Sequence, residues 1–280
     1  RYVKLMENHS EVGYAFCPSV RLEGECETDV VRHTWHGAQD AIFKGRYFLK
    51  KLAKFDCVAT PSVMVRKECY EKISLYPQDL PYSGDWYLWC LFAFRYDAAY
   101  FAEPMVNRRF HDRNLTKFYL KEAIHVYLAN GLDVPWRIKE KAEEAGWDSI
   151  VKVLRQTIAG EYVRRIISKS DGDPQFGITL EEFERSLHSY SKSQCEEIVI
   201  RARVYADLGE YYYRKRDFLR ALEFYRLAVK QNPSLLDIWI KNILLRTGNL
   251  GVFIREGAST LRNRAKRIGT LGVSYDPPGL

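Results

Sequence analysis

The sequence lacks any apolar run long enough to cross a membrane. Its longest run extends from Trp86 to Phe94, about half of the roughly 20 residues that a transmembrane helix needs. Closely spaced cysteine pairs are also missing: the six cysteines lie far apart, none forms a C-x-x-C motif, and the amino terminus has no signal-like character. These absences predict a soluble, cytoplasmic protein with free thiols.

The first 200 residues have no surplus of positive charge, since they hold 28 basic and 29 acidic side chains. Residues 201–280 hold 15 basic and 7 acidic side chains. The net charge of +7 therefore comes from the C-terminal end. A basic end of this kind can bind phosphates, acidic lipids or an acidic partner. The alternative is that its basic side chains form a solvated helix face. No recognised nucleic-acid module accompanies the charge, so we expect no nucleic-acid binding.

Residues 1–116 alternate short apolar runs with turn signals. Two segments have the character of strands and two have helical spacing: 12–22 and 57–67, then 44–55 and 85–95. Another short strand is stopped by Pro104, because proline cannot donate to a sheet ladder in the middle of a strand. A polar segment, 107–116, follows. This pattern predicts an α/β fold.

From residue 117 onward strand signals vanish and amphipathic stretches take over, which predicts helices. Three turn-forming segments are expected to separate those helices: NGLDVP at 130–135, SDGDPQFG at 170–177 and QNPS at 231–234. With 46% apolar residues in 280, the chain has enough material for two domains with real cores.

Residues from Ala202 onward fit a 34-residue helix-turn-helix repeat. The positions that fit are Tyr205, Leu208, Gly209, Tyr212, Ala221, Tyr225, Ala228 and Pro233. Small residues at three of these positions let two helices approach closely while aromatic rings fill the gaps between them. The segment therefore resembles a tetratricopeptide repeat, which implies a helical surface that binds a protein partner.

Residues 252–268 have the pattern of a basic amphipathic helix. Its apolar stripe consists of Ile254, Ala258, Leu261, Ala265 and Ile268, and most of its arginines lie off this stripe. The segment either caps the helical repeat or contacts a membrane surface. In the second case the protein would be peripheral to the inner face of the membrane.

Asp85 stands directly ahead of the longest apolar run in the sequence. An Asp in this position is a favoured helix cap, because its oxygens accept backbone N–H groups that have no partner within the helix. The partial positive charge at a helix start also favours the ionised carboxylate. Cap and proton acceptor are compatible roles, and both remain open for Asp85 at this point.

The neighbourhood of Asp85 carries an ordered set of motifs. They are a strand ending in Arg66, Gly-Asp-Trp-Tyr-Leu-Trp at 84–89, a strand closed by Glu-Pro at 103–104, Arg-Arg-Phe-His at 108–111, and Asn-Leu-Thr at 114–116. In order and spacing this stretch resembles the carboxyl-terminal half of the catalytic domain in glycosyltransferase family 2, whose members have the GT-A fold. Residues 1–59 resemble the segment just upstream. Gly84 and Arg108 depart from the acid and the tyrosine that the family usually has.

The resemblance implies an inverting enzyme that moves a sugar from a nucleotide-sugar donor to a glycan or glycolipid acceptor in polysaccharide biosynthesis. Asp85 would be the general base that accepts the proton of the acceptor hydroxyl. Arg109 would contact the donor diphosphate, and His111 the diphosphate or a divalent Mg²⁺ or Mn²⁺ ion; surface hydrogen bonding is the alternative for both. Arg66 is a further substrate-binding candidate. Trp86 either lines the acceptor pocket or belongs to the core.

Two motifs of that family are missing. No Asp-x-Asp motif suited to holding the metal is present, since the matching letters at 171–173 fall between predicted helices. We therefore expect the back half of a transferase domain, inactive alone, whose metal and donor binding depend on a preceding part. The Q-x-x-R-W motif of processive membrane enzymes is also absent, which favours an enzyme that adds single sugars.

These observations predict four parts: an incomplete GT-A-type α/β domain, a helical linker or solenoid, an all-α tetratricopeptide-like repeat with a capping helix, and a tail. Their bounds are residues 1–117, 118–200, 201–268 and 269–280. The competing interpretation is a non-catalytic tetratricopeptide-type scaffold for protein partners, with a relic of a transferase at its start. The missing metal motif and Gly84 favour this alternative.

Overall fold

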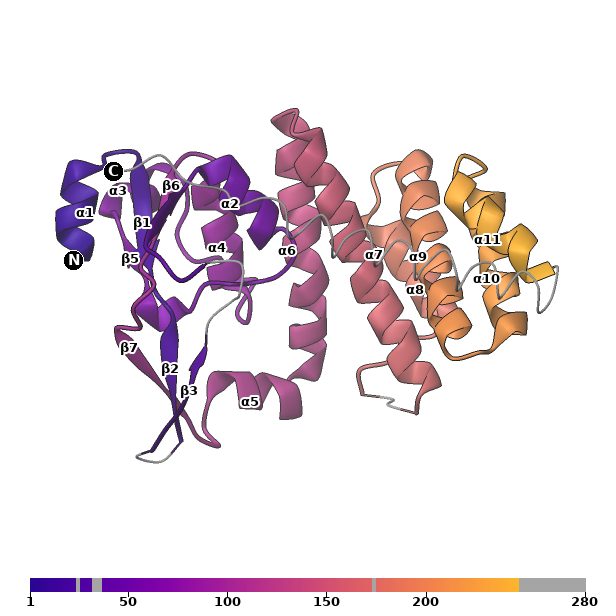
Figure 1. The fold of residues 1–280 in the computed structure, drawn as a ribbon, viewed down its shortest axis with the longest axis horizontal. Helices are drawn as coiled ribbons and strands as arrows, with labels where there is room; N and C mark the ends of the chain where they lie inside the picture. The colour runs from indigo at the N-terminus through magenta and orange to yellow at the C-terminus, as the bar shows by residue number, and fades with distance from the viewer. Residues whose placement is uncertain (24–25, 32–36, 173–174, 247–280) are drawn as a thin grey trace. The chain divides into compact units, whose positions relative to one another are not determined.

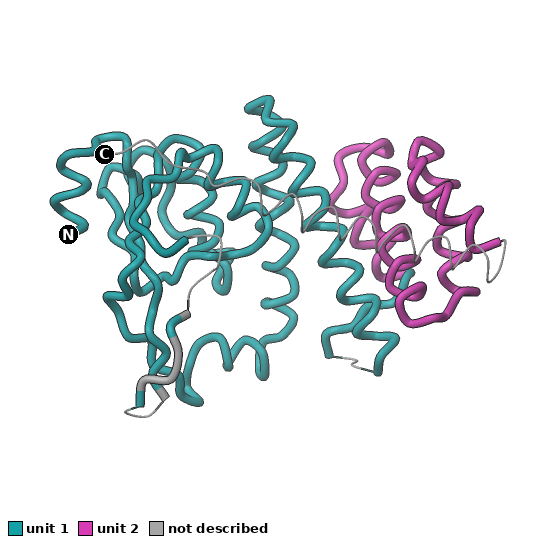
Figure 2. Tube along the Cα trace, viewed as in Figure 1, with its two compact units in different colours: residues 1–180 teal, residues 181–280 magenta. Residues whose placement is uncertain are grey.

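The structure is a computed structural model that describes residues 1–23, 26–31, 37–172 and 175–246. The chain divides into two compact units, Arg1–Leu180 and Glu181–Leu280 (Figure 2). Unit 1 is mixed α/β, and the described part of unit 2 is helical. Unit 1 extends past residue 117, where the sequence suggested a boundary, and includes the helices up to Ser170.

Two small sheets form the centre of unit 1 (Figure 1). The first has the order β4-β6-β1-β5, with bounds Ala41–Phe43, Asp97–Tyr100, Val12–Phe16 and Met64–Val65. In it β1 and β6 are parallel, and the two outer strands run antiparallel to their neighbours. The second has the order β3-β2-β7, with bounds Cys26–Val31, Ser19–Glu23 and Val106–Phe110. Strand β2 is parallel to β7 and antiparallel to β3.

Helices cover both faces of the first sheet, so every residue of β1 is buried. On one face Tyr14 and Phe16 pack against α2 (Gly45–Leu52) and α4 (Gly84–Ala93). On the other face Val12 and Ala15 form a smaller cluster with Met6 of α1 (Tyr2–Asn8). Burial on both faces explains why this strand is an unbroken apolar run rather than an alternating one.

One sequence prediction for unit 1 needs correction, and one polar segment that carried no structural prediction forms parts of a strand and a helix. In the segment 57–67 only Met64–Val65 forms a strand, preceded by a 3₁₀ turn at Thr60–Ser62 and followed by α3 (Lys67–Lys72). The polar segment 107–116 lies largely in β7 and at the start of α5 (Leu115–Lys121). Strand β7 forms despite its polar side chains because its backbone pairs with β2, and alternate residues face solvent.

Two long helices complete unit 1: α6 (Ile124–Glu144) packs against α4, and α7 (Asp148–Ser170) packs against α6. The predicted break at 130–135 is wrong, because α6 continues through it with Pro135 inside the helix. The apolar residues around Pro135 are buried, so packing outweighs the local preference. Among helices in the described ranges, none combines the length and apolar character that crossing a bilayer requires.

The described part of unit 2 consists of α8 (Leu180–Tyr190), α9 (Gln194–Arg214), α10 (Phe218–Gln231) and α11 (Leu236–Arg246). The predicted breaks at 170–177 and 231–234 are confirmed by the helix ends around them. Helices α9 and α10 are closely packed, with the rings of Tyr212 and Phe224 stacked 5.5 Å apart. The basic segment 252–268 and the tail lie outside the described residues.

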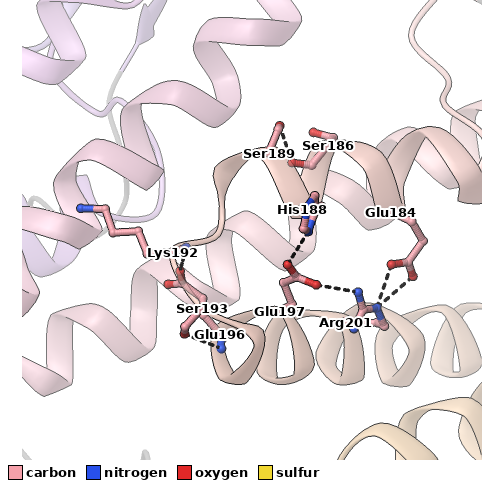
Figure 3. A network of polar contacts seen from close by, with 9 residues as sticks. All are labelled: Glu184, Ser186, His188, Ser189, Lys192, Ser193, Glu196, Glu197 and Arg201. Atoms are coloured by element: carbon pink, nitrogen blue, oxygen red, sulfur yellow. Dashed lines mark hydrogen bonds and ion pairs between the residues drawn. The ribbon is translucent and has the colours of Figure 1, made fainter.

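A polar network joins α8 to α9 (Figure 3). Glu197 lies between two side chains: its Oε1 is 2.9 Å from His188 Nδ1, and its Oε2 accepts a hydrogen bond of 3.1 Å from Arg201. Arg201 also donates to Glu184 of α8 at 2.8 Å. Ser193 caps α9 by accepting the backbone N–H of Glu196. The network fixes the register of the two helices.

The close packing of α9 against α10 can be tested by replacing two glycines. A Cβ built on Gly209 would lie 2.5 Å from a ring carbon of Tyr225, whereas one built on Gly160 in α7 meets nothing within 4 Å. Overpacking costs about 1–3 kcal/mol, and replacing glycine by alanine inside a helix gains about 1 kcal/mol. In denaturant titrations we expect Gly209→Ala to lower the free energy of unfolding and Gly160→Ala to raise it. Stabilisation by both would contradict the close contact between α9 and α10.

Candidate active site

A cavity of about 730 Å³ lies in unit 1, and Asp85 is part of its wall. Four parts of the chain bound it: residues 54–61, the start of α4, strand β7, and the helices α5 to α7. The volume falls in the range of about 300–1,000 Å³ that is typical of small-molecule sites. A cavity of ligand size therefore contains the residue that the sequence singled out.

Asp85 lies in the first turn of α4 and is half-buried. The N-cap position belongs to Ser83, so the expectation that Asp85 itself caps the helix is wrong by two residues. Its Oδ1 nevertheless accepts the backbone N–H of Trp86 at 2.8 Å, one of the donors that a helix start leaves without a partner. Its Oδ2 accepts the hydroxyl of Thr60 at 2.5 Å.

The start of α4 is held by contacts from two other helices. The buried side chain of Asn130, in α6, accepts the backbone N–H groups of Tyr82 at 3.0 Å and Ser83 at 3.3 Å. Trp86 donates its indole N–H to the carbonyl of Leu52, the last residue of α2, at 2.8 Å. Trp86 lines the cavity but is 9% exposed, so it is a core residue with one edge at the site.

Asp56 is a second carboxylate in the same cavity. Loss of water around its carboxyl group, with a further contribution from the negative charge of Asp85, raises the pKa of Asp56 to about 7. The N–H of Val58 and the charge of Arg108 act in the opposite direction. Asp56 as a residue is exposed, so the local surroundings of its carboxyl group, and not enclosure of the whole residue, raise the pKa.

The two adjacent arginines of β7 lie on opposite sides of the strand. Val106, Arg108 and Phe110 are half-buried, whereas Asn107 and Arg109 are exposed, as the two-residue period of a strand requires. The guanidinium of Arg108 lines the cavity and lies 5.0 Å from the ring centre of Phe110. The structure therefore places Arg108 in the wall of the cavity that contains Asp85, and not Arg109, which was predicted to bind substrate.

His111, the predicted metal ligand, is exposed in the turn after β7 and is not part of the cavity wall. Its Nδ1 accepts the backbone N–H of Arg113 at 3.1 Å. Within the described ranges, no three His, Cys, Asp or Glu side chains are arranged to hold a metal ion. The divalent ion that the family resemblance implies therefore stays a prediction.

Arg66, another predicted substrate-binding residue, is engaged with the backbone. Its guanidinium donates to the carbonyls of Val12 at 2.6 Å, of His9 at 3.0 Å and of Met6. These contacts tie the end of α1 and the start of β1 to the strand that Arg66 follows. Arg66 is not part of the cavity wall, and its contacts support a structural role.

One face of the helical wall was not predicted. On α7, residues Thr157, Gly160, Glu161 and Arg164 follow helical spacing and line the cavity together. The sequence shows this spacing, but nothing in it indicates that α7 lies beside the α/β part. Thr60 was missed for a similar reason, because the segment 57–67 was expected to be a strand rather than the loop that forms this wall. Asp56 stands between the predicted helix 44–55 and that predicted strand.

The structural role of Arg66 can be tested by stability. Replacing Arg66 by Met removes charge-assisted hydrogen bonds to three carbonyls, so we expect the free energy of unfolding to fall by about 3 kcal/mol. The control is Lys67→Met, which removes a surface ion pair with Glu71 and should cost less than about 1 kcal/mol. A loss for Arg66→Met no larger than that of the control would contradict the structural role.

Asp56 leads to a prediction about pH. Its carboxyl group binds a proton more tightly in the folded state, with a pKa of about 7, than the ordinary value of 3.8. The folded protein therefore loses stability as pH rises through this window. We expect Asp56→Asn to be more stable than wild type above pH 7, with the difference vanishing below about pH 4.

The measurement is the free energy of unfolding of both proteins at several pH values. Asp112→Asn is the control with the opposite sign, because an exposed ion pair with Lys117 lowers the pKa of Asp112. Its loss of stability should be present above the unfolded pKa of Asp112 and disappear as pH falls. A constant difference between wild type and Asp56→Asn at all pH values would contradict the raised pKa.

Comparison with known proteins gives no family for this chain. No protein-family model, no curated protein and no solved structure matches it. The assignment of a function therefore depends on the residues of the cavity and on the motif order around Asp85.

Proposed function

We propose that the chain is part of an inverting glycosyltransferase: the carboxyl-terminal part of a GT-A-type domain followed by a tetratricopeptide-like helical extension. In this proposal the enzyme uses a nucleotide-sugar donor and a glycan or glycolipid acceptor, and Asp85 is the general base. The observation that carries the proposal is the carboxylate of Asp85, fixed in the first turn of α4 and facing a cavity of ligand size. The order of motifs from Arg66 to Thr116 supports it.

The hydrogen bond from Thr60 to Asp85 suggests how the base works. The Thr60 hydroxyl lies 2.5 Å from Oδ2, at the distance from which an acceptor hydroxyl would give up its proton. As that proton moves to Asp85, the hydroxyl oxygen forms a bond to the anomeric carbon of the donor sugar. The bond from this carbon to the diphosphate breaks with its electron pair, and the sugar configuration inverts.

The surroundings of Asp85 agree with such a reaction. Arg108 supplies positive charge in the same cavity, and Tyr82 and Trp86 supply aromatic surface. Mixed polar and aromatic linings of this kind fix the orientation of a ligand. Arg109 stays a prediction for the donor diphosphate, and His111 stays a prediction for the diphosphate or a divalent ion.

A second candidate is a non-catalytic scaffold of the tetratricopeptide type. The observation that favours it is a group of large apolar side chains exposed on α11: Leu236 is 72%, Trp239 44% and Ile240 58% exposed. Exposed apolar surface of this kind often marks a protein-binding site. Peripheral membrane contact through residues 252–268 stays a prediction, because that segment lies outside the described residues.

The test is sugar transfer by the full-length protein, screened with nucleotide sugars in the presence of Mg²⁺ or Mn²⁺. We expect Asp85→Asn to lower kcat by about 10²–10⁴-fold, since it removes the general base, while thermal unfolding stays close to wild type. Thr60→Val should keep most of the activity, because the hydroxyl only occupies the place of the acceptor.

The matched control is Asp112→Asn, which removes an exposed carboxylate outside the cavity and should leave turnover unchanged. Full turnover in Asp85→Asn would remove Asp85 as the base. A folded wild type without turnover on any nucleotide sugar would favour the scaffold.

A further inference from the structure

Helices α6 and α7 supply one wall of the cavity that contains Asp85. Tyr127 and Gly131 come from α6, and Thr157, Gly160 and Arg164 come from α7. Both helices belong to unit 1 together with the sheets. A ligand in the cavity therefore meets the helical wall on one side and the catalytic candidate on the other.

Gly160 makes space in this wall. It lies in the interior of a 23-residue helix, where glycine is less favourable than alanine. A Cβ built on Gly160 would have no atom within 4 Å, so close packing does not require the glycine. The missing side chain leaves room in the cavity. This room is a benefit that can offset the low helix preference of glycine.

Charge in the cavity is close to balanced, which bears on the type of ligand. The basic residues are Lys54, Arg108 and Arg164, and the acidic residues are Asp56, Asp85 and Glu161; Asp56 carries only part of its charge near neutral pH. The guanidinium of Arg164 is held by Glu161 through hydrogen bonds of 2.6 and 3.1 Å. A diphosphate would need a clear excess of cations, and this lining does not have one.

The remaining lining suits a neutral, hydroxyl-rich molecule. Glu161 and Arg164 present both an acceptor and a donor to the cavity, a combination that can bind the hydroxyl groups of a sugar. The rings of Tyr82 and Tyr127 lie edge to face with their centres 4.9 Å apart, and both line the cavity. Their apolar surface can pack against the carbon-bound hydrogens of a sugar ring.

We propose that the face of α6 and α7 formed by Tyr127, Gly160, Glu161 and Arg164 is the acceptor-specificity wall, which binds a neutral saccharide ring and orients one of its hydroxyls toward Asp85. Arg164 and Glu161 hydrogen-bond other hydroxyls of that ring, and Gly160 leaves the space that it occupies. The role of the bound saccharide as acceptor rests on the proposed transferase function, whereas the binding of a saccharide by this wall does not.

The experiment measures binding to the chain by ligand-observed NMR. The neutral probes are the methyl glycosides of glucose, galactose, N-acetylglucosamine and rhamnose, and the anionic probes are uridine diphosphate and inorganic pyrophosphate. We expect at least one neutral probe to bind with a dissociation constant of about 1–10 mM, as is usual for few contacts in an open site. The anionic probes should bind more weakly than that neutral probe.

Two pairs of variants test the wall. Gly160→Phe places a ring in the open space and should weaken binding of the neutral probe by at least about tenfold. Its control is Lys152→Phe, which adds the same ring to an exposed position of α7 outside the cavity and should have no effect on binding. Arg164→Met removes the donor but leaves the ion pair of Glu161 with Arg165 intact, and should weaken binding by about tenfold. Its control is Arg203→Met, which breaks a similarly exposed ion pair on α9 and should not change binding.

If Gly160→Phe leaves the binding of a neutral probe unchanged, the proposed acceptor-specificity wall is wrong. The same holds if no neutral probe binds the folded wild type. Tighter binding of uridine diphosphate or pyrophosphate than of any saccharide would overturn the neutral ligand class. These failures differ from a failure of the proposed function, which would appear as saccharide binding sensitive to Gly160→Phe together with turnover that does not depend on Asp85.

Discussion

The side-chain carbonyl of Asn130 accepts the backbone N–H groups of Tyr82 and Ser83, and the position of Asp85 depends on this contact. The two N–H groups come just before α4, so their partner fixes where the helix begins and which way its first turn faces. Asn130 is 2% exposed, and a buried amide without partners would be costly. The contact therefore couples the long helix α6 to the carboxylate that faces the cavity.

The cavity combines charges that modify one another. Asp85 adds negative charge near Asp56, whose pKa of about 7 means that a proton is bound to part of the molecules near neutral pH. Arg108 acts on Asp56 in the opposite direction. The site thus contains Asp85, whose carboxylate accepts two hydrogen bonds, and Asp56, whose carboxyl group exchanges its proton near pH 7. Such differences between neighbouring acids are typical of functional sites.

The sequence predicted what depends on local pattern. The helix behind Asp85 and the buried strand at Val12–Phe16 follow from their apolar spacing, and QNPS marks the end of α10 correctly. What depends on tertiary contacts could not be found this way. NGLDVP was read as a break because its packing against α4 is invisible in the sequence. Arg109 was preferred to Arg108 because it stands at the arginine position of the family motif, and β7 was not recognised as a strand. Its two-residue alternation was the signal that would have corrected this choice.

The central claim is that the cavity between Asp85 and the wall formed by α6 and α7 binds a saccharide, whereas the scaffold interpretation places ligand binding on the helices of unit 2. Backbone amide shifts of the isotopically labelled chain, recorded during titration with the neutral methyl glycosides, test this most directly. The account predicts that the shifts concentrate at Thr60, Asp85 and Gly160. Shifts confined to residues 194–246, with none around the cavity, would contradict it.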